Sequence, residues 1–274
     1  MQLHKPTLAN RLGKAAARPL SRLVCSSLLY KPARLAEAYL NFLIGKGSGT
    51  GWNLEAEVTA AARRVRRPNP VLFDVGANVG NWTEGMLQRL PDARVFMFDP
   101  SPGCQAVIRE KHLPRSTLIP CALGEQPGQA SFSFSSPTDG SASLYVRRDT
   151  PFRELSYQTV TVEVRTLDEV IDSLKVDFVD FMKMDIEGHE LYALRGAKRA
   201  LAAGKIGALS FEFGCGNINS RTFFRDFWEL ATGAGFTLWR ITPCGKEIEV
   251  AEYYEDQEYF RGATNYVAVS GNAV

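Results

Sequence analysis

The sequence predicts an α/β protein built on a doubly wound, mostly parallel sheet, and two observations lead to this prediction. Short apolar segments, for example VLFDV at 71–75 and VDFVDFMKMD at 176–185, are typical of strands buried on both faces of a sheet. Segments with helical spacing of apolar residues separate these strands, and alternating strands and helices form parallel sheets covered by helices. The 274 residues are 45% hydrophobic and 11% aromatic, which is sufficient for a large core.

The elements follow one another from residue 71 to residue 270. Strands are expected at 71–75, 93–99, 116–123, 176–185, 206–213, 236–242 and 265–270, and helices at 81–90, 102–113, 166–174, 188–201 and 221–235. Segments 128–136, 142–148 and 157–164 alternate apolar and polar residues, which predicts an inserted antiparallel ribbon. No helix separates the last two strands, so this edge of the sheet is expected to be antiparallel.

Residues 1–70 differ from the rest of the chain in charge. They hold 12 Lys/Arg and 3 Asp/Glu, whereas the remainder holds 20 and 27. We interpret them as a basic helical extension with a Gly/Ser linker at 45–52 and a helix at 53–67 that has Asn53 as its N-cap, and residues 71–274 as the main domain. The charge suggests contact with an anionic surface, such as lipid headgroups, nucleic acid or the acidic main domain, or else a solvated arm.

The cysteine pattern and the hydropathy exclude several protein classes. The five cysteines are widely spaced and form no CxxC motif, so neither a zinc site nor a disulfide framework is indicated. No apolar run approaches the roughly 18 residues of a membrane-spanning helix, and basic residues interrupt the first apolar segment, unlike a secretory signal. The sequence therefore favours a reducing cytoplasm.

A glycine turn after the first strand indicates a nucleoside-binding crevice, because ligands of doubly wound sheets bind beyond the carboxyl ends of the strands. Gly76 and Gly80 let the backbone approach a ligand, and Asp99 ends the second strand 19 residues later, where an acid accepts ribose hydroxyls. The spacing G-x-x-x-G departs from the dinucleotide pattern, and Asp74 would repel a pyrophosphate. S-adenosylmethionine, which is cationic and has no phosphate, is favoured over a nicotinamide dinucleotide.

With these elements in place, residues 71–269 resemble the FkbM family of S-adenosylmethionine-dependent methyltransferases. The segments that carry the resemblance are FDVGANVGNWT, FMFDPSP, CALGEQPGQASFSF, GSASL, VRTLDEVI, VDFVDFMKMDIEGHELYALRGA, LSFEF and NYVAV. Asp99 stands where the family more often has Glu. The resemblance implies a seven-stranded class I methyltransferase fold, which is Rossmann-like, and methyl transfer to a hydroxyl, often on a sugar, glycan, lipid or secondary metabolite.

The glycine turn and its neighbours are the predicted cofactor site. We expect the methionine part of the cofactor to be held by Asp74, Gly76, Ala77, Asn78 and Gly80. Asp99 is expected to bind the ribose hydroxyls, and Cys121, Ala122 and Leu123 to border the adenine. Ser141 and Ser143 either approach the cofactor from the ribbon or simply form turns.

The segment KMDIEGHE, at the end of the fourth strand, concentrates candidate catalytic residues, which are Lys183, Asp185, Glu187 and His189. An attacking hydroxyl must lose its proton, which a carboxylate or a neutral imidazole can accept and a lysine can assist. The ordinary pKa of histidine makes His189 the natural base, or else His189 caps the following helix. Asp185 either faces the crevice or is the N-cap of the same helix. Glu212 ends the fifth strand, so Asp185 and Glu212 would together bind Mg²⁺ or orient the acceptor without a metal.

The leading prediction is an S-adenosylmethionine-dependent O-methyltransferase that acts on a small-molecule or glycan hydroxyl and binds no nucleic acid. Three alternatives stay open: a nucleic-acid methyltransferase that uses the basic extension, a nicotinamide-dependent oxidoreductase, and a non-catalytic adaptor with a cofactor fold. We expect a cytoplasmic protein whose basic N-terminal region could make peripheral membrane contact.

Overall fold

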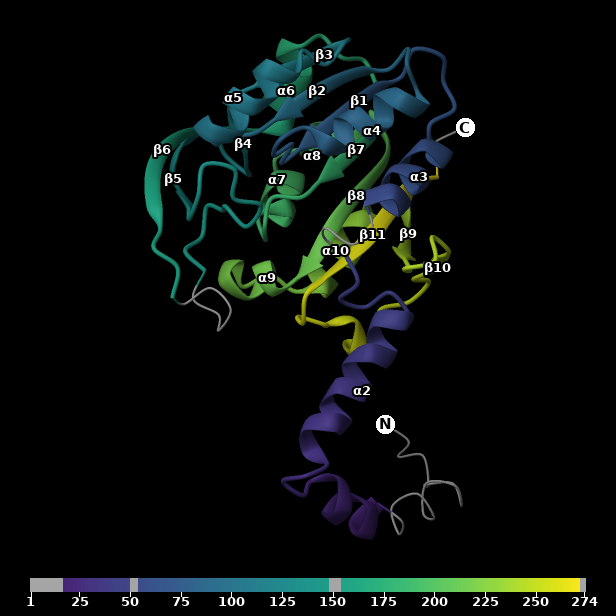
Figure 1. Ribbon diagram of the computed structural model, residues 1–274. Helices are drawn as coiled ribbons and strands as arrows, with labels where there is room; N and C mark the ends of the chain where they lie inside the picture. Colours follow the sequence, from purple (N-terminus) through teal and green to yellow (C-terminus); the bar gives the residue numbers. More distant parts are fainter. Residues whose placement is uncertain (1–16, 50–53, 148–153, 272–274) are drawn as a thin grey trace. The chain divides into compact units, whose positions relative to one another are not determined.

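The computed structural model describes residues 17–49, 54–147 and 154–271 and divides into two compact units, Met1–Ile44 and Gly45–Val274 (Figure 1). The predicted boundary after residue 70 therefore lies too far along the chain. Residues 45–70, which the charge pattern groups with the extension, fall in the larger unit with the sheet. The predicted N-cap Asn53 lies outside the described residues.

The larger unit is organised around an eight-stranded sheet in the order β10-β9-β11-β8-β7-β1-β2-β3. The strands are β1 (Val71–Val75), β2 (Arg94–Phe98), β3 (Ser116–Ile119), β7 (Val179–Met184), β8 (Ile206–Gly214), β9 (Phe236–Ile241), β10 (Glu247–Glu249) and β11 (Ala263–Ser270). The pairs among β3, β2, β1, β7 and β8 are parallel, whereas β11 pairs antiparallel with both β8 and β9. The mostly parallel sheet and its antiparallel edge are as predicted, and the short β10 adds an eighth strand to the expected seven.

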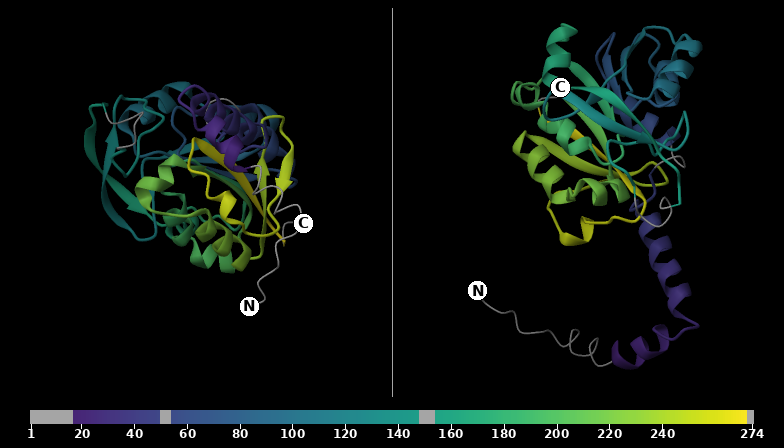
Figure 2. Two further views of the ribbon diagram at one scale, coloured as in Figure 1. Left: turned by 90° about the horizontal axis from the view of Figure 1, so that it is seen from below. Right: turned by 90° about the vertical axis from the view of Figure 1, so that its left-hand side faces the viewer.

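Helices cover both faces of this sheet, as Figures 1 and 2 show. The helices of the larger unit are α3 (Leu54–Arg64), α4 (Asn81–Arg89), α5 (Pro102–Lys111), α6 (Leu167–Ser173), α7 (Glu190–Arg195), α8 (Lys198–Ala202), α9 (Cys215–Ser220), α10 (Phe224–Gly233) and the 3₁₀ turn η1 (Glu255–Gln257). One core cluster joins α3, α4 and α5 to alternate strand residues such as Leu72 and Phe181. The other joins α6, α7, α8 and α10 to the intervening residues, such as Phe73 and Phe211. This alternation is what a doubly wound sheet requires.

A second, three-stranded sheet holds the predicted ribbon. It consists of β4 (Ala122–Leu123), β5 (Gly128–Phe134) and β6 (Gln158–Arg165) in the order β4-β6-β5, with β5 and β6 antiparallel. The segment 142–147, predicted as a strand, contributes only an isolated bridge between Ser143 and Ser133. The predicted third strand is divided at Pro120 into β3 and β4, which belong to different sheets, because proline cannot donate a ladder hydrogen bond.

The segment 45–49, predicted as part of a flexible linker, is anchored to the larger unit. The ammonium of Lys46 donates to the backbone oxygen and the carboxylate of Asp256, both at 2.6 Å. The amide of Gly47 donates to the Thr264 hydroxyl, and that of Gly49 donates to the Ala263 carbonyl at 2.7 Å. Side chains at Gly47 and Gly49 would collide with neighbouring atoms, so these glycines serve close packing rather than flexibility.

The smaller unit is helical in its described part. Residues 17–24 are helical, and α2 (Tyr30–Leu43) follows and has no buried residue. Within the described ranges, no helix combines the length and the hydropathy that a bilayer crossing needs.

Candidate active site

A cavity of about 370 Å³ lies at the carboxyl ends of β1, β2 and β7. Its lining residues fall into two groups. We call Gly76, Ala77, Asn78, Asp99, Cys121, Ala122 and Leu123 the turn side of the cavity. We call Lys183, Asp185 and Glu187, with the neighbouring Glu212 and Arg147, the acidic side. The two sides bring together most of the residues that the sequence predicts for a cofactor and for catalysis.

The backbone of Gly76 passes so close to β7 that no other residue fits there. Its φ is +78°, and a Cβ at this position would lie 1.8 Å from the carbonyl oxygen of Asp185. The amides of Gly76 and Ala77 both donate to the carbonyl of Phe98, at 2.9 and 3.0 Å, which fixes the turn against β2. Gly80 has a φ of +80° at the N-cap of α4 and does not line the cavity. The first glycine is therefore needed for close approach and the second for its backbone conformation.

Asp99 follows β2 and is held by two backbone amides. Its carboxylate accepts from the amide of Asn78 at 2.7 Å and from that of Ser101 at 2.8 Å. Burial raises the pKa of Asp99 to about 6, although these two hydrogen bonds act to lower it. Each carboxylate oxygen has a second lone pair, so the group can still accept hydrogen bonds from a bound diol.

Asp74 lies behind the turn and not in the cavity wall. The side chain is fully buried, its Oδ2 accepts from the Thr83 hydroxyl at 2.6 Å, and its Oδ1 faces the ammonium of Lys183 at 3.9 Å. Burial raises the pKa of Asp74, while Lys183 and Thr83 lower it. The predicted direct contact between Asp74 and a cofactor is not what this geometry offers, because Asp74 joins α4 to the sheet instead.

Polar side chains form two rows across the sheet on the face covered by α3 and α4. Asp74 of β1 pairs in register with Lys183 of β7, which pairs in turn with Ser210 of β8. Beyond this row, Glu212 of β8 is opposite Asn265 of β11. Because side chains alternate between the faces of a strand, these groups share the face opposite to that of Phe73 and Phe211.

Lys183 is a buried cation surrounded by carboxylates. Its ammonium donates to Asp185 Oδ2 at 3.1 Å. Burial by itself lowers the pKa of Lys183, but the charges of Asp185, Asp74 and Glu57 outweigh burial and raise it. The lysine is thus a fixed positive charge at the floor of the cavity.

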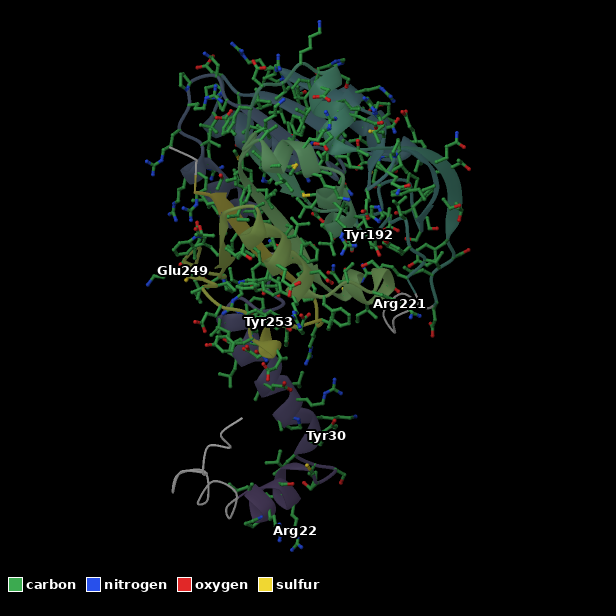
Figure 3. The ribbon with its side chains drawn as sticks, turned by 180° about the vertical axis from the view of Figure 1, so that it is seen from behind. Arg22, Tyr30, Tyr192, Arg221, Glu249 and Tyr253 are labelled. Carbon is green, nitrogen blue, oxygen red and sulfur yellow. The ribbon has the colours of Figure 1, made fainter. Side chains whose placement is uncertain are left out.

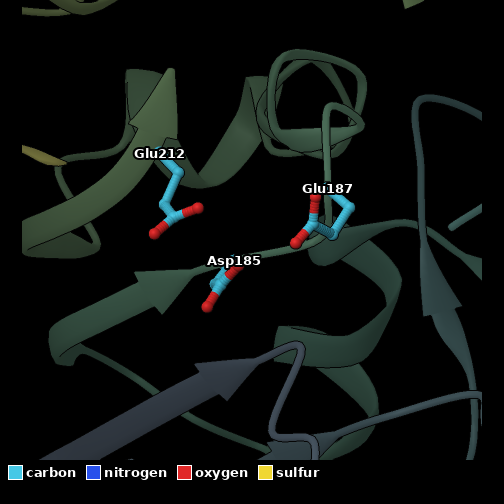
Figure 4. A group of neighbouring side chains, drawn as sticks. All are labelled: Asp185, Glu187 and Glu212. Atoms are coloured by element: carbon cyan, nitrogen blue, oxygen red, sulfur yellow. The ribbon is translucent and has the colours of Figure 1, made fainter. Parts of the chain in front are cut away.

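Three carboxylates meet on the acidic side. One oxygen each of Asp185, Glu187 and Glu212 lies within 4.8 Å of the other two, and Figure 4 shows the groups converging from the end of β7, the following turn and β8. The buried guanidinium of Arg147 donates to Glu187 Oε2 at 2.7 Å and to the sulfur of Cys215 at 2.8 Å. Burial and then the charge of Asp185 raise the pKa of Glu187 to about 8, although Arg147 lowers it.

The turn that carries Glu187 is held in a strained conformation. Glu187 has a φ of +54°, which is unfavourable for a residue with a side chain. The fully buried Glu190 stabilises this turn, because its Oε1 accepts from the amides of Ile186 and Gly188 at 2.9 and 3.2 Å. Burial raises the pKa of Glu190 to about 7. This residue therefore positions Glu187 rather than meeting a ligand itself.

His189 lies apart from the three carboxylates. Its Nδ1 is 2.8 Å from the Tyr145 hydroxyl, its ring stacks on Tyr192, and its Nε2 is 3.3 Å from the position that a Cβ on Gly124 would occupy. The ring thus borders the cavity beside the segment Cys121–Leu123. Burial lowers the pKa of His189 to about 4, so the imidazole is neutral at neutral pH and is a weak base. The role of His189 as the base therefore stays a prediction.

The two predicted serines hold loops and do not line the cavity. The amide and hydroxyl of Ser141 both donate to Asp139 Oδ1, at 2.8 and 2.7 Å. The buried Ser143 donates to the carbonyl of Glu187 at 3.1 Å. Ser143 therefore links the ribbon insertion to the acidic side.

Sequence reasoning missed two residues of this site. Glu57 of α3 lines the cavity, accepts from the Asn265 amide at 2.6 Å, and has its pKa raised to about 7 by burial. It was missed because α3 was assigned to the extension. Arg147 was missed because it reaches Glu187 across 40 residues of sequence from the ribbon. The only available signal was a charged residue at the end of an alternating segment.

The comparison with known families decides the assignment. The model described as "Methyltransferase FkbM domain" matches residues 74–238, which run from the end of β1 through the ribbon and the acidic turn. The chain belongs to this family. The FkbM methyltransferase assignment confirms the resemblance that the sequence motifs indicate.

Named relatives match about half of the chain. The 2-O-methyltransferase NoeI of Sinorhizobium fredii is 32% identical over 151 residues, which cover 50% of this chain and 61% of NoeI. The hexuronic acid methyltransferase AglP of Haloferax volcanii is 29% identical over 149 residues, which cover 54% of this chain and 58% of AglP. The chain thus spans about 60% of the length of these curated relatives.

The chain also aligns with solved methyltransferase structures. A precorrin-6y C5,15-methyltransferase from Geobacter metallireducens aligns with a TM-score of 0.41 at 11% identity, over 78% of this chain and 87% of that one.

Proposed function

We propose that this FkbM protein is an S-adenosylmethionine-dependent O-methyltransferase whose acceptor is a sugar or glycan hydroxyl. The observation that carries the proposal is one cavity with two chemically different sides, a glycine turn with Asp99 and a group of three carboxylates. The acceptor class rests on the relatives named as a 2-O-methyltransferase and a hexuronic acid methyltransferase. Both the donor and the acceptor are proposals for this chain.

The turn side suits the donor. Gly76, Ala77 and Asn78 line this side of the cavity, where they would hold the methionine part, and Asp99 retains lone pairs for the two ribose hydroxyls. Cys121, Ala122 and Leu123 offer an apolar border for adenine. The donor supplies a methyl group on a sulfonium, and a site that already holds several carboxylates favours such a cation.

The acidic side suits the acceptor. In the proposed reaction the acceptor oxygen forms a bond to the methyl carbon, the carbon–sulfur bond breaks, and its electron pair stays on sulfur. Glu187 takes the hydroxyl proton, because its raised pKa makes it the stronger base, while Asp185 and Glu212 orient the hydroxyl. Lys183, fixed on Asp185, stabilises negative charge that develops on the attacking oxygen.

Mg²⁺ is not required by this scheme. Asp185, Glu187 and Glu212 are hard oxygen ligands of the type that Mg²⁺ prefers, and a bound ion would polarise the acceptor hydroxyl. However, protein cations already lie 3.1 Å from Asp185 and 2.7 Å from Glu187. We therefore propose that the carboxylates work without a metal. Full activity after EDTA treatment and gel filtration supports this, whereas activity that disappears and returns with Mg²⁺ contradicts it.

Two measurements on the full chain test the proposed function. Isothermal titration calorimetry with S-adenosylmethionine, S-adenosylhomocysteine and NAD⁺ is expected to show binding of the first two only. Transfer of a labelled methyl group is expected to hexuronic acids or oligosaccharides and not to RNA or DNA. Binding of NAD⁺ alone would support an oxidoreductase, transfer to RNA or DNA a nucleic-acid methyltransferase, and donor binding without transfer to any hydroxylated sugar an adaptor.

A further inference from the structure

The helical unit at 17–44 exposes an unusual amount of apolar surface. Of the 18 large hydrophobic side chains that are exposed in the described residues, 11 lie between residues 20 and 44. The most exposed are Leu23, Leu28, Leu35, Tyr39 and Leu40, each at least 60% accessible. A soluble surface with no partner rarely carries apolar side chains at this density.

Four of the apolar residues of α2 form one stripe along the helix, whereas Leu40 lies outside it. Leu35, Tyr39, Phe42 and Leu43 recur at the spacing i, i+4, i+7 and i+8, which places them on one face. By the same geometry Glu37, the only acid among residues 17–44, lies on the opposite side. Figure 3 shows the side chains of this unit, with Arg22 and Tyr30 labelled.

The charge of the unit identifies the kind of surface that would cover the stripe. Residues 17–44 hold four basic side chains, Arg18, Arg22, Lys31 and Arg34, against one acidic side chain. Residues 1–16 add Lys5, Arg11 and Lys14 and no acid. On α2 itself, Lys31 lies one turn before Leu35 in the same row and Arg34 lies to one side of the stripe, so long basic side chains border the apolar face. An apolar stripe bordered by such cations matches an anionic bilayer, where the stripe enters the acyl boundary and the cations extend to the headgroups.

We propose that residues 17–44 bind an anionic lipid surface as an interfacial helix pair, with the apolar stripe of α2 inserted and its basic residues at the headgroups. The helix lies in the plane of the interface and does not cross it. This function is separate from methyl transfer, because no residue of 17–44 lines the cavity.

Vesicle sedimentation of the full chain tests the proposal. The chain is expected to sediment with vesicles of phosphatidylcholine and phosphatidylglycerol, at least about tenfold more than with phosphatidylcholine alone, and raised salt is expected to weaken this binding. Leu35→Glu combined with Leu43→Glu is expected to reduce binding at least about tenfold, since both side chains would be removed from the acyl boundary. Ile248→Glu combined with Ile218→Glu is the matched control, because it places the same two charges on exposed apolar sites of the larger unit.

Three outcomes overturn the proposal. The first is no sedimentation with anionic vesicles. The second is binding that the Leu35→Glu, Leu43→Glu variant leaves unchanged. The third is a dimer in solution that this variant dissociates, without any vesicle binding, which would make the stripe an interface between two copies of the chain. Donor binding by calorimetry is expected to be equal in all variants, so failure of the membrane proposal and failure of the proposed activity are separate results.

Discussion

The two sides of the cavity are built in different ways. The turn side is made by short-range backbone geometry, since Gly76, Ala77 and Asn78 are consecutive and are tied to β2 by amide hydrogen bonds. The acidic side is made by charged side chains that come together from β7, β8 and the ribbon. The tight backbone contact at Gly76 leaves no space for an added atom. By contrast, the protein can lose one charged side chain of the acidic side and still fold. We therefore expect substitutions on the turn side to affect folding and binding, and those on the acidic side to affect turnover.

This difference also explains what the sequence could predict. The glycine turn and Asp99 lie within one strand–helix–strand unit, so their spacing alone located them. Asp185 and Glu212 were predicted to face each other, because neighbouring parallel strands end at the same edge. Arg147 and Glu57 could not be predicted, because their positions depend on how the ribbon and α3 pack against the sheet. The orientation of the His189 ring could not be predicted from the sequence either, because it depends on packing against Tyr145 and Tyr192.

The largest expected effect is that of Gly76→Ala. The new methyl group would lie 1.8 Å from the Asp185 carbonyl oxygen, so β1 and β7 would have to separate. We expect a loss of about 4 kcal/mol or more in the free energy of unfolding, measured by urea denaturation. Gly235→Ala is the control: its φ of +80° is close to the +78° of Gly76, but nothing lies within 4 Å of the added carbon, so we expect a loss of about 1–2 kcal/mol. Equal losses would mean that the close approach is unimportant.

Asp185→Asn tests the acidic side directly. The amide keeps the size of the side chain but removes the charge that faces Lys183 and, in the proposed reaction, the acceptor. We expect kcat to fall at least about 100-fold, while the Kd for S-adenosylhomocysteine changes less than about threefold. Asp177→Asn, an exposed acid at the other end of β7, is expected to be silent. If the variant loses donor binding in parallel with kcat, Asp185 binds the donor and not the acceptor.

Arg147→Gln tests how the positive charge of the guanidinium controls the pKa of Glu187. Arg147 lowers the pKa of Glu187, which burial has raised to about 8, so removing the guanidinium raises that pKa further. Because the base must be ionised, activity of the wild type is expected to rise with pH through about 8, and the rise is expected at higher pH in the variant. At pH 7.5 we expect about a 10-fold to 100-fold lower kcat. Arg66→Gln, at an exposed site, is the control; an unshifted pH profile would remove Glu187 from the role of base.

Asp99→Asn is expected to weaken donor binding by about tenfold and to leave kcat at saturation nearly unchanged, because an amide group cannot accept from both the Asn78 and Ser101 amides. In the wild type, donor affinity is expected to fall as the pH falls through about 6, since protonation of Asp99 removes an acceptor for the ribose. Calorimetry over a pH series measures both effects. The exposed Asp92→Asn is the control, and pH-independent affinity would argue against contact with the ribose.

The smallest effect is expected for His189→Phe. The replacement keeps a ring against Tyr192 and loses the contact with the Tyr145 hydroxyl. Because burial lowers the pKa of His189 to about 4, its protonation does not change across the neutral range. We expect kcat to change less than about threefold and the pH profile to keep its shape. A kcat that falls as far as in Asp185→Asn would restore the histidine to the catalytic step.

The contact between the glycine turn and the end of β7 has a consequence for how the two substrates would meet. The main chain of Gly76, on the turn side proposed for the donor, contacts the main chain of Asp185, on the acidic side proposed for the acceptor. These residues follow the adjacent strands β1 and β7. In the proposed reaction, the distance between donor and acceptor would then depend on the spacing of these two strands. In such an enzyme the central sheet would align the two substrates. The acceptor could then change through substitutions of side chains that line the cavity, without changes to the sheet.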